Sequence, residues 1–223
     1  MVHPTFRSGL NISNLRILDL GCGKGAVSIK IAKQLDCTVK GLDAMPDFIK
    51  SAKDYAKEFQ VLDKCNFEVG DIRIKINEMK GFDVVILGAI GPVLGNLHTT
   101  LLTLAKSLKT QGYVLLDDGF IPDESPVDYN RCLRKSDFYN QIKTAGFEII
   151  QEIILDKNII RDSEKLMYAL LEKRVNELTV QHPEKKELFE GYLRSQEYEG
   201  YMLGAELVTG TWLLGNNNTV PNK

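Results

Sequence analysis

Short apolar runs alternate with helix-like spacing over the first two thirds of this chain, and this alternation constrains the fold most. Residues 16–20 form an apolar run that ends at a glycine, which is typical of a buried parallel strand. After Gly25, apolar residues recur every four positions (Val27, Ile31, Leu35), as they do on one face of a helix. Strands that alternate with amphipathic helices predict an α/β fold with a parallel sheet covered on both faces.

Seven strands are predicted in all. They cover residues 16–20, 38–42, 66–69, 82–87, 113–116, 147–155 and 206–214. The helices between them are predicted to begin after Gly25, at Pro46, at Leu97 (ending near Leu108), and at Ser136, which is a suitable N-cap residue.

The composition excludes several classes of protein. The 223 residues are 43% hydrophobic and 26% charged, as in a globular chain rather than a disordered or collagen-like one. The net charge of -2 lacks the basic surplus typical of nucleic-acid-binding proteins. The four cysteines are scattered, which argues against a zinc site and a disulfide framework. No apolar run is long enough to span a bilayer, and residues 1–10 lack the apolar core of a secretion signal, so we expect a cytoplasmic protein.

The stretch Asp19-Leu20-Gly21-Cys22-Gly23-Lys24-Gly25 lies at the predicted turn from the first strand into the first helix. Glycines at such a turn let the backbone approach a ligand, and the N-terminus of the helix presents amides to it. The spacing Gly21-x-Gly23-x-x-Ala26 also satisfies the relaxed dinucleotide fingerprint. Asp19 distinguishes the two ligand classes, because a carboxylate repels a pyrophosphate but stabilises an ammonium or a sulfonium group.

Residues 17–25 resemble motif I of the class I S-adenosylmethionine (SAM)-dependent methyltransferases. Asp43 ends the second predicted strand 22 positions after Gly21 (43 minus 21), where the family's acidic residue holds the ribose hydroxyls. Asp71 follows the third strand, where the family binds the adenine amino group. The resemblance implies SAM as methyl donor, S-adenosylhomocysteine (SAH) as product, and a set of cofactor-binding residues: Asp19, Gly21, Cys22, Gly23, Asp43, Ala44, Met45, Asp71, Ile72 and Gly88.

Further motifs resemble, more narrowly, a ubiquinone/menaquinone-methyltransferase-like bacterial group. They are Gly88-Ala89 after strand four, Asp118 after strand five, and Ser136-Asp137-Phe138. The resemblance implies a Rossmann-like, mostly parallel sheet of seven strands whose last strand is antiparallel. It also implies an enzyme that transfers methyl to an O, N or C nucleophile of a small molecule by in-line displacement.

Residues 162–202 read as two consecutive helices parted near His182-Pro183, and we predict that they form a helical cap over the acceptor site. The cap would be inserted between strands six and seven of a single domain spanning residues 1–223. Two antiparallel strands need only a tight hairpin, yet about forty residues lie between them. The segment holds four of the eight tyrosines, Tyr168, Tyr192, Tyr198 and Tyr201. The alternative is that these helices pack on the sheet or form a dimer contact.

Asp118 and His98 are the candidate catalytic residues. Asp118 would orient or deprotonate the acceptor, and the alternative is a plain turn carboxylate. His98 would act as a general base, and the alternative is a solvated residue at the start of a helix. We predict no metal site, because Asp117 and Asp118 would need a third carboxylate after strand four, where the chain has Gly88-Ala89-Ile90.

Two other functions stay open at this point. A nucleotide-dependent oxidoreductase would use the glycine fingerprint, and a non-catalytic protein would bind SAM without turnover. Asp43 and Asp71 could also be ordinary acids at helix N-termini. The predicted partner is a small-molecule acceptor, with no nucleic acid or membrane, and the chain is predicted to be a monomer or a homodimer.

Overall fold

The structure is a computed structural model that describes residues 14–217. Residues 1–13 and 218–223 lie outside the described part. The expectation that residues 1–10 are not a secretion signal therefore falls outside it as well. The described chain divides into two compact units. The first comprises the chain up to Asp118, Phe138–Glu152 and the residues from Thr211 onward, and the second comprises Gly119–Asp137 and Ile153–Gly210. No described helix is long and apolar enough to cross a membrane.

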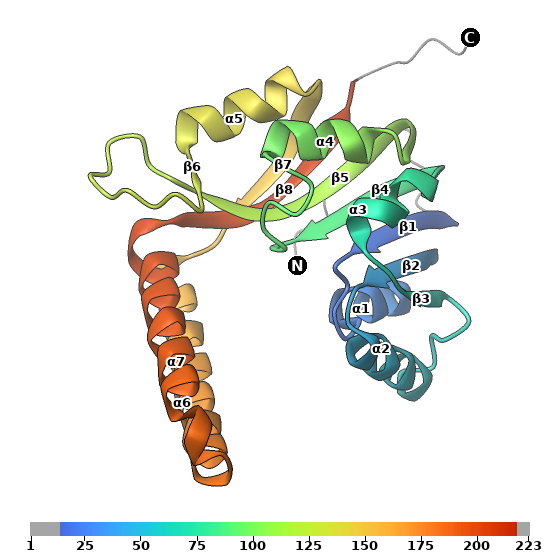
Figure 1. The fold of residues 1–223 in the computed structure, drawn as a ribbon. Coiled ribbons are helices and arrows are strands. Elements are labelled where there is room, and N and C mark those ends of the chain that lie inside the picture. Colours follow the sequence, from blue (N-terminus) through green and yellow to red (C-terminus); the bar gives the residue numbers. More distant parts are fainter. Residues whose placement is uncertain (1–13, 218–223) are drawn as a thin grey trace. The chain divides into compact units, whose positions relative to one another are not determined.

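Eight strands form one sheet in the order β3-β2-β1-β4-β5-β8-β7, with β6 paired to β5 off this path (Figure 1). The strands are β1 (Leu15–Leu20), β2 (Cys37–Asp43), β3 (Cys65–Val69), β4 (Phe82–Gly88), β5 (Leu108–Ile121), β6 (Leu133–Arg134), β7 (Phe147–Ile154) and β8 (Val208–Asn216). Strands β1 to β6 pair in parallel. Leu155 N donates to Thr209 O and Asn217 N to Gly146 O, so β8 runs antiparallel to β7, as predicted.

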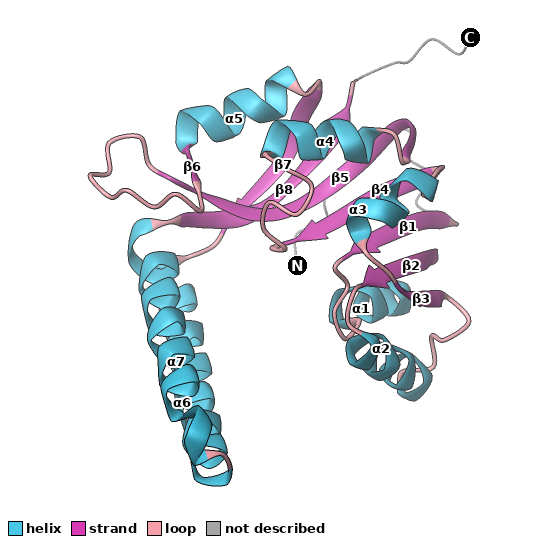
Figure 2. Ribbon diagram, viewed as in Figure 1, coloured by secondary structure: helices cyan, strands magenta, loops and turns pink. Residues whose placement is uncertain are grey.

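Seven helices connect the described strands (Figure 2). They are α1 (Ala26–Gln34), α2 (Pro46–Glu58), α3 (Ile72–Lys75), α4 (Leu97–Ala105), α5 (Lys135–Thr144), α6 (Lys157–Gln181) and α7 (Lys186–Tyr201). A 3-10 turn at Pro183–Lys185 separates α6 from α7, where the two long helices were predicted to part. The very short β6 and α3 were not predicted, because two to four residues carry no periodicity.

The core of the first unit includes a layer of apolar side chains between one face of β1–β3 and the helices α1 and α2. Alternate strand residues such as Ile17, Val39 and Phe67 point into it, and Ile29 and Ala52 meet them from the helices. All five are less than a tenth exposed. This packing holds the strand ends that carry the candidate cofactor residues.

Trp212 of β8 anchors another part of this unit. Its fully buried ring lies against Phe138 of α5 with 4.8 Å between the ring centroids. Its indole Nε1 donates to Glu152 Oε2 at 2.9 Å, and the hydroxyl of Tyr139 donates to the same oxygen at 2.8 Å. The polar edge of the indole is therefore paired inside an apolar setting, as a buried tryptophan requires.

The second unit joins the α6–α7 hairpin to the loop after β5. A small core of Ile121, Met202 and Leu207 lies where they meet. Within the loop, the guanidinium of Arg134 donates to the carbonyl oxygens of three residues, Pro122, Ser125 and Val127. Tyr129 then contacts Tyr198 of α7 edge-on, with 6.1 Å between ring centroids.

Two predicted helix boundaries are wrong because contacts with residues distant in the sequence set them. Leu108 begins β5 rather than ending α4, because it pairs with Phe82 before the register shifts to pair Val84 with Tyr113. Ser136 lies inside α5 and does not cap it. Instead Asp123, thirteen residues earlier, accepts hydrogen bonds from the amide and the hydroxyl of Ser136 through Oδ1, both at 3.0 Å.

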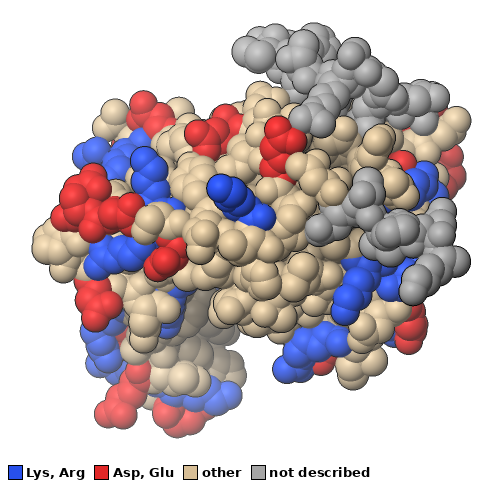
Figure 3. All heavy atoms as spheres, turned by 90° about the horizontal axis from the view of Figure 1, so that it is seen from above, with Lys and Arg blue, Asp and Glu red and all other residues tan. Residues whose placement is uncertain are grey.

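Acidic and basic side chains lie interspersed on the face of the described chain seen in Figure 3, rather than in one large patch of a single sign. On this face the near-neutral net charge of the chain therefore corresponds to interspersed charges of both signs.

Candidate functional site

Parallel pairing brings the candidate cofactor residues of the first unit to one edge of the sheet. Asp19 pairs with Gly41 and with Ile86, which aligns the ends of β1, β2 and β4. Asp43 pairs with Val69 at the end of β3. Because these strands run in the same direction, their carboxyl ends form a common edge, where open α/β sheets bind ligands.

The glycine turn after β1 is held by its neighbour β2. The amides of Gly21 and Cys22 both donate to the carbonyl of Leu42, at 2.8 and 3.1 Å. Gly21 and Gly23 have positive φ angles of 70° and 54°, which favour glycine. A Cβ on Gly21 would collide with Ile90, whereas nothing lies within 4 Å of a Cβ on Gly23. Gly23 therefore borders open space, and Gly21 is needed for close packing.

Asp43 fastens this turn to the end of β2. Its Oδ2 accepts the amide of Gly23 at 2.9 Å, and its Oδ1 accepts the amide of Met45 at 2.9 Å. Each carboxylate oxygen has a second lone pair, so Asp43 can accept two further hydrogen bonds, the number that a ribose diol offers.

Asp19 is a buried carboxyl group at the base of the turn, with 4% of the residue exposed. Its Oδ2 accepts the hydroxyl of Ser28 at 2.5 Å. Burial raises the pKa of Asp19, and the negative charge of Asp43 raises it further, against the opposing effect of Ser28. A cation bound at this place would stabilise the ionised form, so Asp19 suits a positively charged ligand.

Cys22 is also part of this turn, but its side chain belongs to the apolar core beneath α1 and α2. Burial, with the charges of Asp19 and Asp43, raises the pKa of this thiol to about 12. The thiol is therefore protonated and unreactive near neutral pH.

Asp71 caps α3 and is engaged by Arg73. It accepts the backbone amide of Arg73 at 2.8 Å and its guanidinium at 2.6 Å. These hydrogen bonds lower the pKa of Asp71. Beside this strand end, Ile72 is buried, whereas Ala44 and Met45 are exposed after β2. Ala44 and Met45 are therefore accessible to a flat ligand, whereas the carboxylate of Asp71 is already paired with Arg73.

At the other side of the edge, Gly88 ends β4 and pairs with Asp117 of β5. Nothing lies within 4 Å of a Cβ on Gly88, so this strand end also borders open space. Partial burial raises the pKa of Asp117. Because neighbouring strand residues point to opposite faces, Asp117 and Asp118 lie on different faces of β5.

His98 is the second residue of α4, and its side chain is half-buried. Its backbone amide donates to Gln141 Oε1 of α5 at 3.0 Å, which fixes the start of the helix. Sequence reasoning missed Gln141 here, as it missed Ser28 and Ile90 at the glycine turn. Each of these contacts joins residues distant in sequence or lies in a loop without a recognisable spacing.

Among residues 14–217, no group of three or more His, Cys, Asp or Glu side chains is arranged to hold a metal ion.

Comparison with known proteins places this chain in a family. Residues 11–174 match the model of a methyltransferase domain, which is well over half of the chain. The chain belongs to the methyltransferase domain family. The resemblance to class I SAM-dependent methyltransferases is thereby confirmed, and with it the enzyme class and the family's methyl donor.

Curated relatives of this methyltransferase include two proteins named ubiquinone biosynthesis O-methyltransferase. One, from Rickettsia akari, is 28% identical over an alignment of 158 residues that covers 62% of this chain and 61% of the relative. The other, from Rickettsia canadensis, is 28% identical over an alignment of 179 residues that covers 72% of this chain and 72% of the relative. The match thus spans less than two thirds of the first relative's length.

Solved structures similar to this methyltransferase confirm the Rossmann-like fold. A SAM-dependent methyltransferase from Thiobacillus denitrificans, crystallised with SAH, has a TM-score of 0.75 at 21% identity, with coverage of 91% of this chain and 85% of that one. One from Geobacter sulfurreducens, also with SAH, has a TM-score of 0.76 at 20% identity, covering 91% and 84%.

Proposed function

We propose that this chain transfers the methyl group of SAM to a nucleophile of a small molecule, without a metal ion. One observation carries the proposal: Asp43 bridges the glycine turn and the end of β2, beside the open space at Gly23. When bound, SAM supplies a methyl group on a positively charged sulfur. The open space at Gly23 and the two carboxyl groups of Asp19 and Asp43 fit such a ligand.

In this proposal each residue has a distinct task. Asp43 accepts the ribose hydroxyls, and Asp19 stabilises the positive charge of the donor. Ala44, Met45 and Ile72 flank the adenine, and Asp71 binds its amino group. The turn of Gly21, Cys22 and Gly23 and the strand end at Gly88 present their backbone to the cofactor, with open space in place of a side chain at Gly23 and Gly88.

The acceptor nucleophile is most simply an oxygen, because the curated relatives above are named as O-methyltransferases. Transfer to nitrogen or carbon would use the same donor site. An acceptor hydroxyl must lose a proton, and we propose Asp118 or His98 as the group that takes it. The protein's remaining task is to hold the nucleophile about 3 to 3.5 Å from the methyl carbon, away from water.

The segment 162–202, which lies within the second unit, is proposed as the helical cap that selects the acceptor. Its exposed tyrosines suit a wall with an apolar body and a polar tip. Packing alone, or a contact between two copies of the chain, is the competing role.

The direct experiment combines binding with turnover. SAM and SAH should stabilise the full chain in a thermal-shift assay, whereas NAD should not, because the carboxylate of Asp19 at the glycine turn would repel its pyrophosphate. Radiolabelled SAM with fractionated small-molecule extract should then yield SAH and a labelled product. Stabilisation by NAD instead would favour the oxidoreductase. Binding of SAH without turnover by any fraction would favour the non-catalytic protein.

A further inference from the structure

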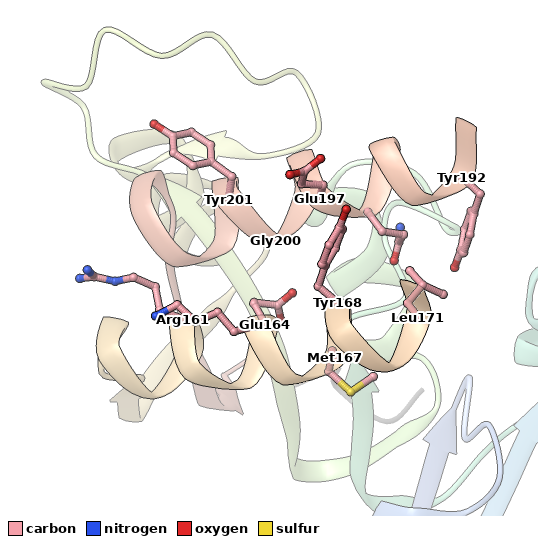
Figure 4. A pocket seen from close by; sticks show the side chains of 11 residues that line it. Arg161, Glu164, Met167, Tyr168, Leu171, Tyr192, Glu197, Gly200 and Tyr201 are labelled. Carbon is pink, nitrogen blue, oxygen red and sulfur yellow. The ribbon is translucent and has the colours of Figure 1, made fainter. Parts of the chain in front are cut away.

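A cavity of about 440 Å³ lies between α6 and α7, entirely within the second unit. Figure 4 shows that Tyr168 rises from α6 into the space between the helices, while Tyr192 descends from α7 beside Leu171. The two rings and the leucine give the cavity apolar walls. None of the cofactor residues proposed above lines it, so the cavity is distinct from the proposed cofactor site.

Two carboxylates border this cavity. Glu164 lies against Gly200, since a Cβ at Gly200 would come within 3.0 Å of Glu164 Oε2. The Tyr168 hydroxyl points toward Glu197 in Figure 4. Desolvation raises the pKa of Tyr168, and the negative charges of Glu197 and Glu172 raise it further. Within residues 14–217, the carboxylates of Glu164 and Glu197 make no hydrogen bond or ion pair.

The two cations of the lining are engaged elsewhere. Arg161 points away from the cavity in Figure 4, and its Nε donates to the carbonyl of Lys157 at 3.3 Å. Lys165 pairs with Asp162 at 3.8 Å, and its side chain is 79% exposed. The lining therefore holds two basic and two acidic side chains, but the two basic ones are engaged outside the cavity and the carboxylates of Glu164 and Glu197 border it.

We propose that this cavity binds an organic cation: a quaternary or protonated ammonium group on a small apolar body. The negative faces of Tyr168 and Tyr192 attract such a cation, and Glu164 and Glu197 supply the opposite charge. Leu171 and the ring edges contact the apolar body. Magnesium or calcium does not fit, because either ion needs more oxygen ligands than two carboxylates provide. This site is distinct from the proposed cofactor site, and all of its lining except Arg161 lies within the segment 162–202 that is proposed above as the cap.

The test uses the full chain and a defined probe, benzyltrimethylammonium, with benzyl alcohol and benzenesulfonate as neutral and anionic comparisons. Calorimetry should detect binding of the cation alone at millimolar concentrations. Combined Glu164→Gln and Glu197→Gln should weaken it about tenfold or more, and Tyr168→Leu severalfold. Amide chemical-shift changes should concentrate on α6 and α7.

The matched control is Glu187→Gln, which makes the same charge change on α7 outside the cavity lining. It should leave the affinity for the cation unchanged. The proposal would be overturned if the cation did not bind at millimolar concentrations or if benzyl alcohol bound equally well. It would also be overturned if Glu187→Gln lost as much affinity for the cation, or if the amide chemical-shift changes lay outside α6 and α7. SAH affinity, measured on the same variants, should stay at the wild-type value and separately reports the cofactor site.

Discussion

The amide of Gly23 donates a hydrogen bond of 2.9 Å to Oδ2 of Asp43, twenty residues further along the chain. This bond joins the turn after β1 to the end of β2. The same carboxylate also holds Met45, the first residue before α2. One side chain thus organises three segments around the space next to Gly23, before any ligand arrives.

Asp43→Ala should weaken SAH binding. It removes the acceptor for the ribose hydroxyls, at a cost of about 1.5 to 3 kcal/mol for each charge-assisted bond lost. Calorimetry measures the affinity, and Asp54→Ala on exposed α2 is the control for a lost negative charge. Unchanged SAH affinity in folded Asp43→Ala would remove the ribose role from this residue.

Substitutions at Gly21 and Gly23 should separate packing from ligand binding. Gly21→Ala should lower the unfolding temperature, because its Cβ collides with Ile90, and an added Ile90→Ala should restore part of the loss.

Gly23→Val finds space in the fold but occupies the position proposed for the ligand. It should abolish SAH binding in calorimetry, at a cost in stability limited to the strain of its positive φ. Normal SAH binding by Gly23→Val would mean that the ligand lies elsewhere.

Asp19→Asn should stabilise the ligand-free protein at neutral pH while it weakens SAM binding. The folded-state pKa of Asp19 is raised above its ordinary value of 3.8. The contribution of Asp19 to the stability of the wild type is therefore fully present below pH 3.8. It is lost as the pH rises through the raised pKa. The variant escapes this loss, so its free energy of unfolding should exceed that of the wild type at pH 7. Denaturant unfolding at several pH values checks it, and a difference that grows toward low pH would contradict the assignment.

Chelation should leave methyl transfer unchanged. The loop after β4 supplies Gly88-Ala89-Ile90, so Asp117 and Asp118 lack a third carboxylate there. Once an acceptor is known, the rate with EDTA should equal the untreated rate. Activity that disappears with EDTA and returns with Mg²⁺ would overturn the metal-free proposal.

Tyr198→Ala tests the cap. The residue contacts Tyr129 in the loop after β5, so its loss should loosen that loop as well as the wall of the hairpin. We expect a higher KM for the acceptor or a lower kcat, with SAH affinity near the wild-type value. Light scattering on the same variant gives the competing outcome: a change from dimer to monomer with kinetics unaltered would favour a contact between copies.

Local motifs made much of this fold predictable. The turn from Gly21 to Gly25 is predictable from a local spacing, and Asp43 stands out through its distance from that turn in the family that the chain resembles. The pairing of Asp19 with Ser28, the cap of α5 by Asp123, and the register shift that places Leu108 in β5 were not predictable. The pairing with Ser28 depends on how α1 is oriented against β1, and the other two depend on which distant segment packs alongside. Such tertiary contacts override local propensity. The roles of His98 and Asp118 stay predictions for the same reason, because they depend on an acceptor.

The buried ring of Trp212 makes the chain its own optical reporter, since it is the single tryptophan of the sequence. Its emission should change when the contacts with Phe138 and Glu152 break, so tryptophan fluorescence follows the melting of the first unit alone. Far-ultraviolet circular dichroism is weighted by all helices, including the long α6 and α7. Any separation between the two melting curves would therefore measure how far the hairpin unfolds as an independent cooperative element.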